Sequence, residues 1–199
     1  MRLLIALALL APAPAFAAPA GTAAMTCSAP VSALDTAAKL KARFGAQARI
    51  EEVHAAEGEM IQAMVLYPND KARRLEVIFF DEKMRHPSSV RLAGDKPSWM
   101  IAGLKLGDSM ARVEALNGKP FTLQGFDWDY GGYVIDLKQG RLNKLPGGCG
   151  VSIRLEPSAT NVPNGVSGDM ELSSTMAKVR AAKPVISELS LEFAAPKGL

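Results

Sequence analysis

Three stretches of the chain share one residue pattern, and this repeat limits the possible folds more than any other feature. Residues 35–45, 108–118 and 174–184 each open with Asp or Ser followed by Ser or Thr. Each then has Ala at its fourth position, Lys or Arg at its fifth, Leu or Val at its sixth and Ala at its eighth. An Asp or Ser side chain can accept hydrogen bonds from the free N–H groups of a first helical turn, so each stretch is predicted to be a short helix. Three such matches indicate duplicated modules.

The ends of these helices are predicted by their terminal residues. The expected N-cap residues are Asp35, Asp108 and Ser174. The first two helices should end at Gly45 and Gly118, because glycine adopts the left-handed conformation easily. The third should end at Pro184, because proline cannot continue a helix.

Apolar and polar residues alternate after each helix, as they do in strands with one buried face. Candidate strands lie at residues 60–67, 75–80, 90–93, 99–104, 121–123, 126–130, 133–138, 151–155 and 189–193. The alternation slips by one residue at Gly125, which predicts a bulge or a sharp bend there. Turns are expected at residues 68–70 and 131–132, so that neighbouring strands pair as antiparallel hairpins.

Short helices followed by antiparallel strands predict an α+β fold. We expect tandem modules, each a helix plus an antiparallel β-meander, with the helices on one face of the sheet. The expected divisions are a signal peptide at 1–17, a flexible mature N-terminus at 18–26, a first helix/β module at 27–93, a second at 94–156, and a loop plus a third partial helix/strand unit at 157–199.

The first residues are typical of a secretory signal peptide. Arg2 precedes an apolar run at residues 3–10, and residues 15–17 read Ala-Phe-Ala, which matches an A-x-A cleavage site. The run is shorter than the roughly 20 residues of a membrane span, and no second run of that length follows. We therefore expect a periplasmic or secreted protein without a transmembrane segment. A lipid anchor on Cys27 is the alternative, although Thr26 stands where a lipoprotein has Gly or Ala.

The chain has two cysteines, Cys27 and Cys149. An even number in an oxidising compartment predicts one disulfide, which would stabilise the fold by ~4 kcal/mol in the chain-entropy model. Two free or intermolecular thiols are the alternative. The sequence has no C-x-x-C and no cysteine–histidine spacing, and its two histidines are isolated, so we expect no metal and no cofactor.

The charge balance argues against nucleic acid as a partner. Removing residues 1–17 takes away Arg2 and no acid, and leaves 22 basic and 20 acidic residues with a net charge of +2. This charge is too weak and too evenly spread for binding to nucleic acid or an anionic membrane.

The candidate site is the run Asp127, Trp128, Asp129 and Tyr130, followed by Tyr133. On a strand the two aspartates would share one face and the aromatics the other. Such alternation is typical of an ordinary amphipathic strand. Exposed aromatics at a sheet edge would instead be anchors for a protein partner. In a third interpretation, the aspartates are the paired carboxylates of a glycosidase-like site.

Residues 104–120, LKLGDSMARVEALNGKP, resemble the start of the SmpA/OmlA type of bacterial envelope domain, which is duplicated in the β-lactamase inhibitory protein. Positions that match are Gly107, Val113, Gly118, Pro120 and the aromatics at 128–130. The chain departs from the pattern at Asn117, where Leu is usual, and in its Gly131–Gly132 pair. The resemblance is best over residues 104–135, and it implies an envelope protein that binds other proteins and has no catalytic residues.

Together these features predict a non-catalytic secreted or periplasmic protein that binds another envelope protein or inhibits an enzyme. The expected contact residues are Trp128, Tyr130 and Tyr133, with Asp127 and Asp129 tuning the charge and Trp99 as a secondary candidate. A small envelope hydrolase that uses Asp127 and Asp129 is one alternative, and a structural subunit of envelope assembly is another.

Overall fold

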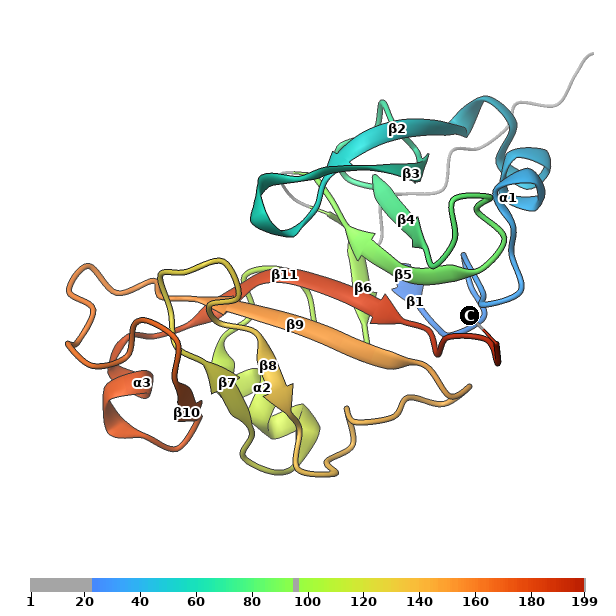
Figure 1. Cartoon of the computed structure of the whole chain (residues 1–199). Helices are drawn as coiled ribbons and strands as arrows, with labels where there is room; N and C mark the ends of the chain where they lie inside the picture. Colours follow the sequence, from blue (N-terminus) through green and yellow to red (C-terminus); the bar gives the residue numbers. More distant parts are fainter. Residues whose placement is uncertain (1–22, 95–96, 199) are drawn as a thin grey trace, which may run out of the picture.

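The computed structural model describes residues 23–94 and 97–198, which contain both α-helices and antiparallel sheets (Figure 1). The elements in chain order are β1 (Ala23–Met25), α1 (Ala37–Phe44), the 3-10 turn η1 (Gly45–Gln47), β2 (Ala48–His54), the 3-10 turn η2 (Ala56–Gly58), β3 (Met60–Leu66), β4 (Leu75–Phe79), β5 (Pro87–Leu92), β6 (Trp99–Ile101), α2 (Met110–Asn117), β7 (Thr122–Gln124), β8 (Val134–Asp136), β9 (Gly150–Glu156), β10 (Glu171–Ser173), α3 (Ala177–Ala181) and β11 (Val185–Glu192). The α+β class is thus confirmed. The expected signal peptide lies outside the described residues. No helix within residues 23–94 and 97–198 is long and apolar enough to cross a membrane.

The largest sheet has six antiparallel strands in the order β2-β3-β4-β5-β11-β9. In Figure 1 the β2–β3 pair runs across the top, whereas β11 and β9 cross the middle of the molecule. The first four strands, β2 to β5, pair in chain order as an antiparallel meander. The last strand, β11, then enters between β5 and β9, and β10 pairs with β7 in the small sheet β10-β7-β8. Each strand of residues 157–199 thus joins a sheet that earlier strands begin.

The end of the segment expected to be flexible forms a strand. Ala23–Met25 pairs in parallel with Trp99–Ile101, and Met25 is buried in the core. Backbone hydrogen bonds and the burial of Met25 fix this segment. Its sequence of small residues has no periodicity, so the pattern alone could not predict a strand.

Two helices are capped one residue later than predicted. Thr36 accepts a hydrogen bond from the backbone N–H of Lys39, and Ser109 accepts one from that of Arg112. The predicted caps face backward instead, since Asp35 accepts from Ser32 N and Asp108 from Lys105 N. Each aspartate thereby fixes the turn that leads into the helix.

The third helix lacks a side-chain cap. Its predicted cap, Ser174, is fully buried, accepts from the backbone N–H of Phe121 and donates to Glu114. The second helix ends as predicted, at Gly118 with a φ of 75°. Gly45 also follows its helix with a positive φ, but its ψ of −123° lies outside the left-handed helical region.

Replacement of Ser109 by alanine should lower the free energy of unfolding by about 1 kcal/mol, because an N–H of the first turn of α2 loses its acceptor. Chemical denaturation measures the change. Ser109→Thr is the matched control, since it keeps a hydroxyl at the cap, and its unfolding free energy should stay close to that of the parent. Equal losses in both variants would show that the hydroxyl does not cap the helix.

Most buried apolar side chains form one cluster. It includes Leu40 of α1, Val113 of α2, Val179 of α3, Met25 of β1 and Leu191 of β11. A second, small cluster consists of Val53, Ala63 and Val65. Neighbouring residues on a strand point to opposite faces. The large sheet therefore has a core face and, across from it, a face on which only the small cluster is apolar and buried among the described residues.

The predicted disulfide is confirmed. Cys27 and Cys149, which are 122 positions apart, are joined with their Cα atoms 5.5 Å apart. The link ties the segment after β1 to the turn before β9. A sulfur in a disulfide has no thiol left for a lipid thioether, so the disulfide-bonded form cannot carry the alternative anchor on Cys27.

Candidate functional site

One face of the large sheet carries charged and hydroxyl side chains. Directly paired residues of an antiparallel sheet point to the same face. Arg91 of β5 lies opposite both Glu76 of β4 and Ser190 of β11, and Ser190 lies opposite Ser152 of β9. The polar face, as we name it, comprises Glu76, Ser89, Arg91, Ser152, Arg154, Glu188, Ser190 and Glu192.

Two ion pairs lie across this face. Arg91 donates from Nε at 2.9 Å and from Nη2 at 2.6 Å to Oε2 of Glu76. Arg154 donates from Nη1 to Oε1 of Glu188 at 2.7 Å. Burial disfavours the charged form of Arg154, but the hydrogen bond and the charge of Glu188 outweigh it and raise the pKa of Arg154 above its usual value.

The sheet curls toward the polar face. The Arg91 guanidinium also donates to the backbone carbonyl of His54, at the end of β2, over 2.7 Å. Three strand spacings separate β5 from β2, about 14 Å in a flat sheet, which is farther than an arginine side chain reaches. The curl brings the turn between β2 and β3 over this face of β5.

The aromatic residues of the candidate site do not form the predicted strand. Residues 126–133, which we call the aromatic loop, follow β7 as a bend and turns, and Asp127 has a φ of 62°. The break occurs at Gly125, where the sequence predicts a bulge or bend. A Cβ at Gly125 would collide with the carbonyl oxygen of Gly168, so the backbones approach too closely for another residue.

The three aromatics of the run differ in burial and do not share one face. Phe126 is buried in the core, Trp128 is half-buried and Tyr130 is 43% exposed. The rings of Trp128 and Tyr130 meet edge to face with their centroids 5.5 Å apart. Trp128 donates from Nε1 to the carbonyl of Gly125 at 2.9 Å. These contacts fix the tryptophan with part of its ring toward solvent.

Arg154 holds the aromatic loop to β9. Its Nε donates to the carbonyl of Gly131 at 2.8 Å, and its Nη2 donates to that of Asp129 at 3.2 Å. The guanidinium also lies over the Tyr133 ring, 5.1 Å from the centroid. Gly132 passes so close to β9 that a Cβ there would collide with the carbonyl oxygen of Leu155. Glycine in the predicted Gly131–Gly132 turn therefore allows the loop backbone to pack directly against β9.

The loop also touches the turn between β2 and β3. The Tyr130 hydroxyl donates to Oε1 of Glu57 at 2.7 Å, a contact between residues 73 positions apart. This hydrogen bond, with the Glu57 charge, raises the pKa of Tyr130. Tyr133 donates to Oε2 of Glu188 at 3.1 Å, and burial followed by the Glu188 charge raises the pKa of Tyr133. Both phenols therefore stay neutral at physiological pH.

The two aspartates of the site are exposed. The Asp127 carboxylate accepts a hydrogen bond from the Ser167 hydroxyl at 2.5 Å. Trp99, the secondary candidate, is only 7% exposed, lies in the core cluster and donates to the carbonyl of Arg73. The prediction of Trp99 as a contact residue is therefore wrong, because its ring packs in the core and does not face solvent.

A cavity of about 390 Å³ lies beside the aromatic loop. Its lining includes Trp128 and Asp127 from the loop, Arg154 and Glu156 from β9, and Val162 from the segment before β10. It is an open recess into which a side chain of a partner could reach.

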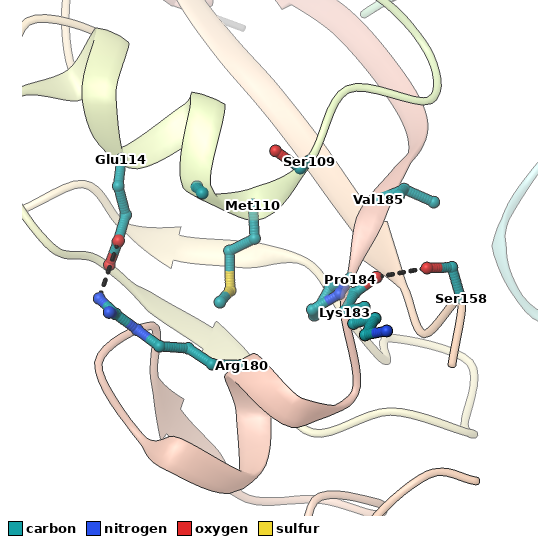
Figure 2. A pocket seen from close by; sticks show the side chains of 9 residues that line it. Ser109, Met110, Glu114, Ser158, Arg180, Lys183, Pro184 and Val185 are labelled. Carbon is teal, nitrogen blue, oxygen red and sulfur yellow. Dashed lines mark hydrogen bonds and ion pairs between the residues drawn. The ribbon is translucent and has the colours of Figure 1, made fainter. Parts of the chain in front are cut away.

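A separate cavity of about 410 Å³ lies between α2 and the start of β11 (Figure 2). Met110 points into it, and Pro184 contributes to its apolar wall. The ion pair of Glu114 with Arg180, 3.0 Å between oxygen and nitrogen, stands on one side, and Lys183 stands on another. No sequence motif indicates this cavity, since its walls come from segments about 70 positions apart in chain order.

Sequence reasoning missed three residues that organise the site, namely Arg154, Glu188 and Glu57. Each contacts the aromatic loop across a large separation in sequence, between 23 and 73 positions. The only local signal was that Arg154 and Glu188 occupy the polar positions of alternating strands. Within the described part of the chain, no three potential metal ligands of the His, Cys, Asp or Glu type lie together.

No protein-family model, curated protein or solved structure matches the chain.

Proposed function

We propose that this is a non-catalytic binding protein of the bacterial envelope whose partner contacts the aromatic loop and the adjoining β2–β3 turn. The observation that carries the proposal is the Trp128–Tyr130 pair, partly exposed yet held in one geometry. Aromatics are enriched at the energetic centres of protein interfaces. A fixed aromatic pair loses little conformational entropy on binding, so more of its contact energy becomes affinity.

The envelope assignment rests on one structural observation and two expectations from the sequence. The disulfide fits an oxidising compartment. The expected signal peptide at residues 1–17 would deliver the chain there. The resemblance of residues 104–135 to the SmpA/OmlA type of domain, with its tandem modules and helices on one face of the sheet, supports a protein-binding role by analogy. The hydrolase hypothesis stays a prediction that no described geometry favours over binding.

Capture of a partner from native periplasm by cross-linking tests the proposal. The parent should capture a partner that Trp128→Ala and Tyr130→Ala lose, and purified partner should bind each variant at least about tenfold more weakly, or 1.4 kcal/mol. Ile135→Ala is the matched control, because Ile135 is 44% exposed on nearby β8 but lies outside the aromatic loop. Its binding should equal that of the parent.

The controls separate the alternatives. All proteins must have the same thermal stability as the parent. Equal capture by parent and loop variants would contradict a role for the aromatics. Co-fractionation with the outer membrane regardless of the loop variants would favour a structural subunit, whereas turnover of an envelope substrate that depends on Asp127 and Asp129 would favour the hydrolase.

A further inference from the structure

The polar face contains a cavity of about 160 Å³ at the base of the aromatic loop. Its lining consists of Ile78, Ser89, Arg91, Tyr133, Ser152, Glu188, Leu189, Ser190 and Glu192. Tyr133 belongs to the aromatic loop, so the cavity is continuous with the surface of the proposed function.

The charges around this cavity are unevenly paired. Arg91 pairs with Glu76, and Glu188 pairs with Arg154, as described above. Glu192 forms no ion pair with any residue that the structure describes. Its carboxylate accepts one hydrogen bond, 2.6 Å from the Ser190 hydroxyl. The cavity therefore contains one carboxylate whose charge no neighbour balances.

The sheet register places hydrogen-bond acceptors around that carboxylate. Glu192 lies directly opposite Ser89 on β5 and Gly150 on β9, and Ser190 lies opposite Ser152. The hydroxyls of Ser89 and Ser152 bond to no group in the described ranges. Gly150 has no side chain to fill the space beside Glu192. One free carboxylate oxygen and two free hydroxyls thus face a common space.

We propose, on the basis of the proposed function, that this cavity binds the primary ammonium group of a lysine side chain presented by the protein partner. An ammonium group has three donors, which match one carboxylate oxygen and two hydroxyls. It is compact, whereas a guanidinium is planar and prefers both oxygens of a carboxylate, one of which Ser190 occupies in Glu192. Ile78, which lies opposite Ser89 on the polar face, offers apolar contact to the methylenes of the lysine stem.

The pKa of Glu192 is shifted in the direction expected for a buried carboxylate without a cation beside it. Burial raises the pKa of Glu192, and the Ser190 hydrogen bond offsets this only in part. A bound ammonium would favour the charged carboxylate and lower that pKa again. Binding should therefore weaken as pH falls through the raised pKa, because the protonated carboxyl no longer attracts a cation. The other charges facing the cavity, on Arg91 and Glu188, are paired, and Tyr133 stays neutral.

NMR titration of the disulfide-bonded protein with Nα-acetyl-lysine methylamide tests the proposal without the partner. Saturable shifts are expected at Ser89, Ser152 and Glu192, with at least tenfold weaker binding in Glu192→Gln. Glu171→Gln is the matched control, since it removes an exposed carboxylate of β10, outside both the cavity and the aromatic loop, and should bind like the parent. The norleucine analogue, which has the stem without the ammonium, should give no saturable shift.

Three results would overturn the proposal: no saturable shift with the lysine probe, equal binding by Glu192→Gln, or equal binding of the norleucine analogue. Glu192→Gln should fold, because it removes a partly buried charge. Ser152→Leu fills the cavity but keeps the Glu192 carboxylate, and it should also abolish binding of the lysine probe. Probe binding should persist in Trp128→Ala. If the probe does not bind while the loop variants still lose the partner, the lysine pocket is wrong and the proposed function stands. If the probe binds while the loop variants still capture the partner, the proposed function alone is wrong.

Discussion

Replacing Cys27 and Cys149 together with alanine is expected to lower the free energy of unfolding by about 4 kcal/mol. The disulfide closes a loop of 122 positions, and a loop of this length restricts the unfolded chain strongly. A loss of this size is a large fraction of the 5–15 kcal/mol that stabilises an ordinary domain. Chemical denaturation of parent and variant, each extrapolated to zero denaturant with its own slope, gives the difference.

Two controls separate the cross-link from the side chains. The reduced parent keeps both sulfur atoms and should lose nearly the same free energy as the double alanine variant. Hydrogen exchange should also rise in residues 138–149, a run of turns that the disulfide ties to the N-terminal segment. A variant within 1 kcal/mol of the parent would show that the loop is held by its buried leucines, Leu142 and Leu145, and not by the disulfide.

Local patterns predicted the elements better than their assembly. The apolar run located β3, which is buried on both faces over residues 63–66. Alternation located β9, whose Ile153 and Leu155 face the core. The pattern missed β2, Ala-Arg-Ile-Glu-Glu-Val-His, since this edge strand carries charges. It also missed the place of β11 in the sheet. The pattern of residues 189–193 predicts a strand but does not indicate that it pairs with both β5 and β9.

The same limit applies to the site. Phe126, Trp128 and Tyr130 alternate as in a strand, but backbone contact at Gly125 turns the chain out of the sheet. The sequence identified the aromatics but not the groups that hold them. Arg154 and Glu57 act through carbonyls and hydroxyls from distant positions, and the pattern of one strand contains no information on such partners.

Replacing Arg154 by methionine is expected to lower the free energy of unfolding by about 2 kcal/mol and to release the aromatic loop. The variant keeps an unbranched stem but loses the hydrogen bonds to Gly131 and Asp129 and leaves Glu188 without its cation. Removing one partner of a buried ion pair costs about 3–5 kcal/mol. The expected loss is smaller because the Arg154 side chain is 23% exposed.

Hydrogen exchange measures the local effect, and the matched control is Arg112→Met. Like Arg154, Arg112 pairs with a carboxylate, that of Asp108, and donates to a backbone carbonyl, but its side chain is 51% exposed. Its loss should cost less than about 1 kcal/mol and leave exchange in residues 126–133 unchanged. Faster exchange of that loop in both variants would mean that the effect is global and that Arg154 has no special role.

The Arg154 variant also tests how the proposed partner would engage the aromatic loop. It leaves Trp128 and Tyr130 intact, so any loss of affinity must come from their lost positioning or from Arg154 itself. If the loop is preorganised, partner binding should fall nearly as far as in Trp128→Ala, and chiefly by a faster dissociation rate. Unchanged affinity together with faster exchange in the loop would show that the aromatic side chains become ordered only when the partner binds. The rigid contacts from Arg154 would then serve stability alone.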